Sequence, residues 1–141
     1  MFALLIKPQA MKKSAHRKVI SDLKQSGAIQ LSGHDPASIR SEVEQLLRKY
    51  PDLTVVACGG DGTVNLCLNS IVDLDVNFAV LPMGTGNDFA RYLGLKKMDD
   101  ALLALEAKVI TKCDIGQVTL SDGASKYFAA VASCGFDAQV N

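Results

Sequence analysis

The sequence predicts an α/β protein with a parallel sheet and helices on both faces of that sheet. Three short apolar runs lack polar alternation, at residues 2–6, 53–58 and 78–81. Such runs are typical of strands that are buried on both sides. Segments with helical spacing of apolar residues separate them, and strands that alternate with helices form parallel sheets. Glycine-rich turns follow the second and third of these runs, where a strand passes into a helix.

The elements are expected in a regular order along the first 107 residues. After the strand at 2–6 and a polar loop at 7–13, Ser14 is expected to cap a helix that continues to about residue 25, with Gly27 ending it. A short strand at 28–31 follows. Asp35 and Pro36 are the preferred pair for an N-cap and a first helical position, so a helix should run from there to about residue 50. Further helices are expected at 63–72, from the second glycine-rich turn to near residue 94, and at 99–107.

The pattern changes after residue 108. Residues 109–120 and 126–134 are strand-like, and a turn at 121–124 separates them, which predicts a β-hairpin. We therefore expect an α/β domain at 1–108 and the first, incomplete part of an all-β domain at 109–141. A lone hairpin is marginally stable in water. It should dock on the first domain, pair with another chain, or belong to a longer protein, of which the last is favoured.

Composition excludes several classes of function. The 141 residues carry 15 basic and 15 acidic side chains, and this balance argues against a nucleic-acid partner. No apolar stretch approaches the ~20 residues of a membrane span. The four cysteines do not have metal-ligand spacing, which favours buried, reduced thiols. A cytoplasmic protein is expected, one that is able to touch a membrane surface.

The first glycine-rich turn has the sequence Gly-Gly-Asp-Gly-Thr at 59–63 and leads into a helix. Free N–H groups at such a turn, together with the helix dipole, favour a phosphate. Asp61 would repel a phosphate unless it binds Mg²⁺, accepts a proton or binds a sugar hydroxyl. The turn therefore points to a nucleotide, and the alternative is an ordinary tight turn. Neither the Walker pattern nor the dinucleotide-binding fingerprint is present.

The second glycine-rich turn comprises residues 84–88. Thr85 could donate to a phosphate, and Asn87 or Asp88 could bind a nucleotide hydroxyl. The alternative is that the glycines serve only backbone conformation and that Asn87 and Asp88 cap the next helix. Because parallel strands end at one edge of a sheet, both turns should lie at that edge, where ligands of open α/β sheets bind.

Four segments in order resemble the diacylglycerol kinase catalytic domain family, which includes bacterial lipid kinases and, more distantly, sphingosine, ceramide and NAD kinases. They are G-G-D-G-T at 59–63, L-P-M-G-T-G-N-D-F-A-R at 81–91, C-D-I-G at 113–116 and S-C-G-F-D-A at 133–138. The resemblance implies a Rossmann-like α/β domain, followed by a β-sandwich domain and an active site in the cleft between them. It also implies transfer of the ATP γ-phosphate, with Mg²⁺, to a lipid hydroxyl such as that of diacylglycerol.

Site residues follow from the same resemblance. Asp61 is implied as the catalytic residue that orients the phosphates through Mg²⁺ or water, and Ser32 stands where relatives carry a nucleotide-contacting threonine. The nucleotide-binding candidates are Ser32, Gly59, Gly60, Asp61, Gly62, Thr63, Val64, Asn65, Gly84, Thr85, Gly86, Asn87 and Asp88. No metal ligands are assigned, because those of bacterial relatives correspond to positions after residue 141.

The sequence departs from the family in three respects, of which the most important is that the catalytic carboxylate and the Mg²⁺ ligands of bacterial relatives correspond to positions after residue 141. Residues 7–11 replace the usual Asn-Pro and its glycine-containing loop, and Leu66 stands where many relatives have Glu. Alternative functions are a kinase for NAD or a sphingoid base, or a non-catalytic nucleotide-binding module. Expected partners are a nucleotide and a lipid at a membrane surface, with self-association through the hairpin as a further expectation. The 141 residues alone are expected to have little kinase activity.

Overall fold

The four expected strands of the α/β part form one parallel sheet. The structure is a computed structural model and describes residues 1–130. Its strands are β1 (Phe2–Ile6), β2 (Ile29–Gln30), β3 (Thr54–Gly59) and β4 (Asn77–Pro82), in the order β2-β1-β3-β4. Pairing is in register from Phe2 opposite Thr54 to Ile6 opposite Cys58. Of the two inner strands, β1 and β3, the longer run of buried residues belongs to β3, as its uninterrupted apolar run predicts.

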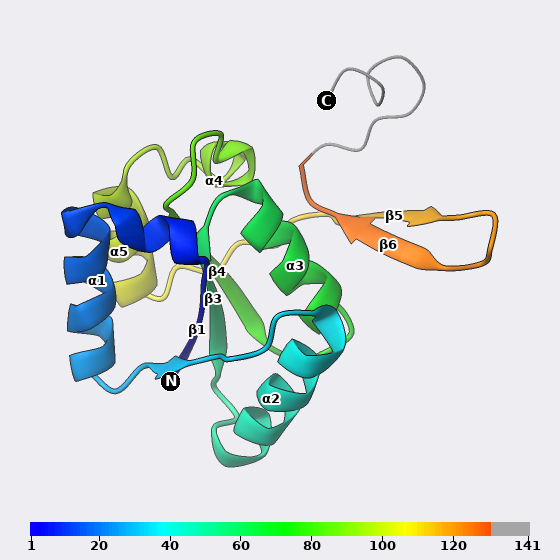
Figure 1. Cartoon of the computed structure of the whole chain (residues 1–141), viewed down its shortest axis with the longest axis horizontal. Coiled ribbons are helices and arrows are strands. Elements are labelled where there is room, and N and C mark those ends of the chain that lie inside the picture. The colour runs from blue at the N-terminus through cyan, green and yellow to red at the C-terminus, as the bar shows by residue number, and fades with distance from the viewer. Residues whose placement is uncertain (131–141) are drawn as a thin grey trace.

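Helices cover both faces of this sheet, so the predicted fold class is confirmed (Figure 1). Helices α1 (Ser14–Gln25) and α5 (Met98–Glu106) cover one face, and α2 (Pro36–Lys49) and α3 (Asp61–Ile71) cover the other. Alternate strand residues point to opposite faces. Leu4 and Val56 therefore pack toward α1 and α5, whereas Leu5 and Ala57 pack toward α2 and α3. The short helix α4 (Asp88–Tyr92) adds Phe89 and Ala90 to the apolar core on the side of α2 and α3.

The start of α2 agrees with the prediction. The carboxylate of Asp35 accepts hydrogen bonds from the N–H groups of Ala37 and Ser38, and Pro36 occupies the first turn. The Ser38 hydroxyl also donates to this carboxylate at 2.7 Å. These bonds satisfy donors that a helix start otherwise leaves without partners.

Two boundaries near the N-terminal ends of helices differ from the prediction. The expected loop at 7–13 contains a 3₁₀ helix, η1 (Pro8–Lys12), whose Ala10 is buried against the sheet. Because η1 leads directly into α1, Ser14 is the first helical residue rather than the cap. Helix α3 begins two residues earlier than expected, since the Gly60 carbonyl accepts hydrogen bonds from the N–H groups of Thr63 and Val64 and closes a first turn.

A separate antiparallel hairpin follows the α/β part. Strands β5 (Gly116–Thr119) and β6 (Ser125–Phe128) are shorter than expected. Residues 109–115 form no strand, because they pair with no other strand among the described residues, and Val109 and Ile110 are exposed. Figure 1 shows the hairpin extending from the body beside α3. The last four residues of the expected strand at 126–134 and the motif at 133–138 lie outside the described residues.

Two of the three cysteines within the described residues are buried, as expected. Cys58 and Cys67 are buried free thiols, and Cys113 is half-buried and free. Among residues 1–130, no helix is long and apolar enough to cross a membrane.

Candidate functional site

The direction in which the chain leaves the sheet switches between the carboxyl ends of β1 and β3. β1 pairs with β2 on one side and with β3 on the other. The chain leaves β1 toward α1 on one face and leaves β3 toward α3 on the opposite face. In open α/β sheets, such a switch in direction marks the place where ligands bind. The turn after β4, the neighbour of β3, lies at the same edge.

The two glycine-rich turns are packed backbone to backbone. A Cβ atom added to Gly84 would lie 2.4 Å from the Cα of Gly60, and one added to Gly60 would lie 3.1 Å from the Cα of Gly84. The N–H of Met83 also donates to the carbonyl of Gly59 at 2.9 Å. Only glycine at position 84 permits this approach, so the two turns form one surface.

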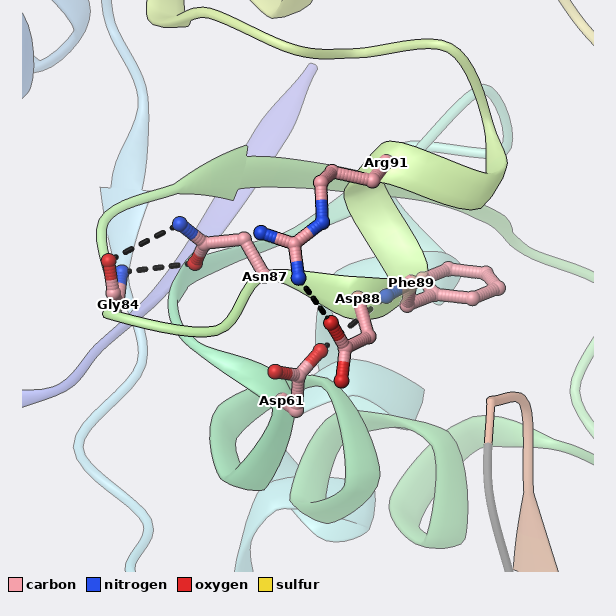
Figure 2. Close-up of polar contacts among 6 residues, drawn as sticks. All are labelled: Asp61, Gly84, Asn87, Asp88, Phe89 and Arg91. Atoms are coloured by element: carbon pink, nitrogen blue, oxygen red, sulfur yellow. Dashed lines mark hydrogen bonds and ion pairs between the residues drawn. The ribbon is translucent and has the colours of Figure 1, made fainter.

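Asp61 joins the first turn to the helix that follows the second turn. Its Oδ1 accepts a hydrogen bond from the N–H of Phe89 at 3.2 Å, as Figure 2 shows. Its Oδ2 is so close to Gly86 that an added Cβ there would lie 2.8 Å away. Asp61 therefore supplies the side-chain hydrogen bond at the start of α4. The alternative interpretation gave this role to Asn87 and Asp88, but Asn87 occupies the N-cap position without a side-chain capping bond.

Asn87 instead holds the second turn in shape. It adopts the left-handed conformation, with φ of 56°. Its side-chain amide accepts from the N–H of Gly84 and donates to the carbonyl of the same residue, both at 2.9 Å (Figure 2). The Asn87 amide thus forms its hydrogen bonds within the turn. Asp88 forms an exposed ion pair with Arg91.

Several backbone N–H groups at these turns have no acceptor within the described part of the chain. They belong to Gly60, Asp61 and Gly62 in the first turn and to Thr85 and Gly86 in the second turn. Thr63 differs from the expectation, because its N–H donates to Gly60 and its buried hydroxyl packs against Gly59. Unpaired N–H groups at the start of a helix form an anion-binding surface.

A cavity of about 270 Å³ lies between the starts of α3 and α4 and the end of β6. Its lining residues are Asp61, Gly62, Val64, Asn65, Asp88, Phe89, Phe128, Ala129 and Ala130. A second, more open cavity of about 510 Å³ shares Asp88 and the end of β6, and reaches Tyr92 and Ile115. Both cavities lie where the α/β part meets the hairpin.

Two candidate residues make contacts that the sequence did not suggest. Ser32 lies at the same sheet edge but is separated from β3 by β1. Its N–H and hydroxyl both donate to Glu42, at 2.9 and 2.6 Å. Asn65 donates to the carbonyl of Tyr127 at 3.3 Å, so its amide contacts the hairpin. Sequence reasoning missed Glu42 and the end of β6, because both contacts depend on tertiary structure.

The buried cysteines are not candidates for catalysis. Burial raises the pKa of Cys67 to about 12, and burial together with the neighbouring Cys67 raises that of Cys58 even further. Both thiols are therefore neutral at physiological pH and cannot serve as nucleophiles.

The fold and these turns define a Rossmann-like α/β protein with a candidate phosphate site at the switch point. Comparisons with known proteins identify the family. Residues 2–118 match the family model of the diacylglycerol kinase catalytic domain, so the chain belongs to that family.

Individual relatives are similar over most of this chain. A diacylglycerol kinase of Mycobacterium tuberculosis is 33% identical over 136 residues, which are 92% of this chain and 42% of that protein. A diacylglycerol kinase of Bacillus subtilis is 40% identical over 97 residues, or 65% and 29% of the two chains. The structure of a putative diacylglycerol kinase from Bacillus anthracis supports the fold, with a TM-score of 0.59 at 24% identity over 81% of this chain and 43% of that one. This chain thus spans less than half the length of these relatives.

Proposed function

We propose that this chain is the ATP-binding part of a lipid kinase that transfers the γ-phosphate of ATP to a lipid hydroxyl such as that of diacylglycerol. The observation that carries the proposal is the contact between the two glycine-rich turns, which Asp61 bridges at the switch point of the sheet. Membership of the diacylglycerol kinase catalytic domain family supports the reaction type.

The triphosphate would be bound mainly by main-chain groups. The N–H groups of Gly60, Asp61 and Gly62 stand at the start of α3, where the helix dipole favours negative charge. Those of Thr85 and Gly86 approach from the second turn. Side chains at positions 60 and 84 would fill the contact between the turns, which explains the glycines there.

The acidic residues present fit a magnesium ion that is bound together with the phosphates. Asp61 and Asp88 line the same cavity, and Mg²⁺ in nucleotide sites commonly uses one or two carboxylates with phosphate oxygens and water. No group of three or more potential metal-ligating side chains occurs within residues 1–130, so a site made of protein ligands alone is not proposed. Bound there, Mg²⁺ would offset the charge of the phosphates during transfer.

Asp61 is proposed as the residue that keeps the phosphates in line. Its Oδ1 is fixed by the N–H of Phe89, which leaves Oδ2 beside Gly86 in the second turn. In phosphoryl transfer the protein contributes mainly positioning and electrostatic stabilisation, and a fixed carboxylate suits that task. A diacylglycerol remains in the membrane, so the acceptor would be met at a membrane surface.

Calorimetric titration with ATP, with and without Mg²⁺, tests the proposal. Asp61→Asn keeps an oxygen for the N–H of Phe89 but removes the charge, and should weaken Mg·ATP binding about tenfold or more, as expected for one charged contact. Asp75→Asn is the matched control, because Asp75 is exposed and has no side-chain partner in the described residues. Equal affinity of Asp61→Asn and the wild type would show that Asp61 serves only as a cap.

The acceptor is tested separately on the full-length protein, because the 141 residues alone are expected to have little kinase activity. Transfer of the γ-phosphate to dioleoylglycerol, sphingosine and NAD is followed in parallel. Transfer to dioleoylglycerol supports the proposal, and preference for either of the others supports a related kinase. Nucleotide binding without transfer to any acceptor favours a non-catalytic module.

A further inference from the structure

We propose that Asn65 and Asn69 of α3 form a clasp on the main chain of Tyr127, and that this clasp positions residues 125–130 as a wall of the cavity beside the glycine-rich turns. The two asparagines lie four residues apart, on the same side of the helix whose start carries Gly62. The inference rests on the proposed function in one respect, namely that phosphates bind at the start of α3.

The clasp uses both main-chain groups of Tyr127. The N–H of Tyr127 donates to Oδ1 of Asn69 at 2.9 Å, and the carbonyl of Tyr127 accepts from Nδ2 of Asn69, also at 2.9 Å. Asn65 donates to the same carbonyl at 3.3 Å. A side-chain carboxamide thus pairs with an extended residue much as a neighbouring strand would, with one donor and one acceptor.

Both Nδ2 hydrogens and the Oδ1 atom of Asn69 form hydrogen bonds. Its second Nδ2 hydrogen donates to the main-chain carbonyl of Asn65 at 2.9 Å. The opposite orientation of the amide would place its NH₂ group against the N–H of Tyr127, so only the observed orientation satisfies every group. Asn69 is also partly buried, which makes an unsatisfied amide there costly.

The N–H and carbonyl of Tyr127 are available to Asn69 because they lie on the edge of β6 that does not pair with β5. Tyr127 stands opposite Gln117 in the antiparallel pair. Since its N–H and carbonyl both bind Asn69, they point away from β5, as in the pairs of an antiparallel ladder that do not exchange hydrogen bonds. The edge that would otherwise be open is therefore covered by α3.

The position of the clasp relates it to the candidate site. The three residues after Tyr127, which are Phe128, Ala129 and Ala130, line the cavity together with Asp61 and Gly62 at the start of the same helix. Helix α3 therefore contacts the phosphate side with its first turn and holds the hairpin with its second and third turns. The hairpin should follow any change that nucleotide binding imposes on α3.

Hydrogen–deuterium exchange of the amides at 125–130, with and without Mg·ATP, tests the clasp. Asn69→Leu removes the amide donor and the amide acceptor. It should raise the exchange rate of these amides in the absence of nucleotide about tenfold, close to the effect of one net hydrogen bond. Asn69→Asp keeps the acceptor but places a second oxygen against the Tyr127 carbonyl, and should have a similar effect. Asn69→Gln retains the carboxamide and should keep part of the protection. Asn77→Asp, at an exposed position in β4, makes the same chemical change elsewhere and should leave exchange unaltered.

Mg·ATP should slow exchange at 125–130 in the wild type. In Asn69→Leu this slowing should disappear, while calorimetry shows Mg·ATP affinity within about twofold of the wild type, since no nucleotide contact is removed. Unchanged exchange in Asn69→Leu without nucleotide would overturn the clasp. Persistence of the nucleotide effect in that variant would overturn the positioning role. Absence of Mg·ATP binding by the wild type would refute the proposed function and with it the coupling to nucleotide, whereas the nucleotide-free comparison still decides whether the clasp exists.

Discussion

The carboxylate of Asp61 accepts the main-chain N–H of Phe89 at 3.2 Å, although 28 positions separate the two residues. This bond connects the turn after β3 to the helix after β4. It gives Asp61 a structural role in addition to its proposed role at the phosphates, and suitable variants can separate the two.

Replacing Asp61 with alanine should lower stability more than replacing it with asparagine. Asp61→Ala removes the cap of α4, which should lower the free energy of unfolding by about 1 kcal/mol. Asp61→Asn keeps an acceptor and should lower it by less than half of that. Chemical denaturation measures the difference, and both variants should nevertheless bind Mg·ATP poorly. Equal stability of the two variants would contradict the capping role.

Gly84→Ala should damage the contact between the two turns. The new Cβ would lie 2.4 Å from the Cα of Gly60, and main-chain atoms cannot give way as a flexible side chain can. A loss of about 1–3 kcal/mol in the free energy of unfolding is expected, together with weaker Mg·ATP binding. Gly62→Ala is the control for stability, since a Cβ there meets no atom within 4 Å. Should both variants be equally stable, the turns are not packed as described.

The cap of α2 should make stability depend on acidity. Hydrogen bonds from the Ser38 side chain and main chain hold the pKa of Asp35 below its usual 3.8. A carboxyl with a lowered pKa contributes stability above its unfolded-state pKa, and that contribution is lost as the pH falls through the folded-state value. Asp35→Ala should lower the thermal midpoint by about 3–5 °C at pH 7. The difference from wild type should shrink toward pH 2, and Asp75→Ala should have no comparable effect at either pH.

Thiol reactivity should follow burial. At pH 8, a thiol reagent should label the half-buried Cys113 in the native protein, but not Cys58 or Cys67. Burial raises the pKa of both inner thiols, so almost no thiolate is available to react. Mass spectrometry identifies the labelled sites, and labelling in guanidinium, where all thiols are accessible, is the control. Rapid native labelling of Cys67 would show that α3 opens readily.

Much of the fold could be predicted because local patterns carry it. The apolar runs at 2–6 and 53–58 are strands, and Asp35 with Pro36 begins a helix, as the residues themselves dictate. Pairing partners determine what local patterns do not. Residues 109–115 are apolar enough for a strand, yet they form none, since strand structure needs a neighbour to bind its main chain. The 3₁₀ helix at 8–12 likewise depends on Ala10 packing against the sheet.

The sequence by itself determined that two glycine-rich turns follow successive strands of a parallel α/β sheet, because strand and helix periodicities and the turn residues are local properties. Only the tertiary structure decided that Gly60 touches Gly84, that Asp61 rather than Asn87 caps α4, and that Asn69 binds Tyr127 at a separation of 58 positions. Each of these is a contact between segments that are distant in the chain. Which donor meets which acceptor is then set by the packing of whole elements, and no periodicity in the sequence records it.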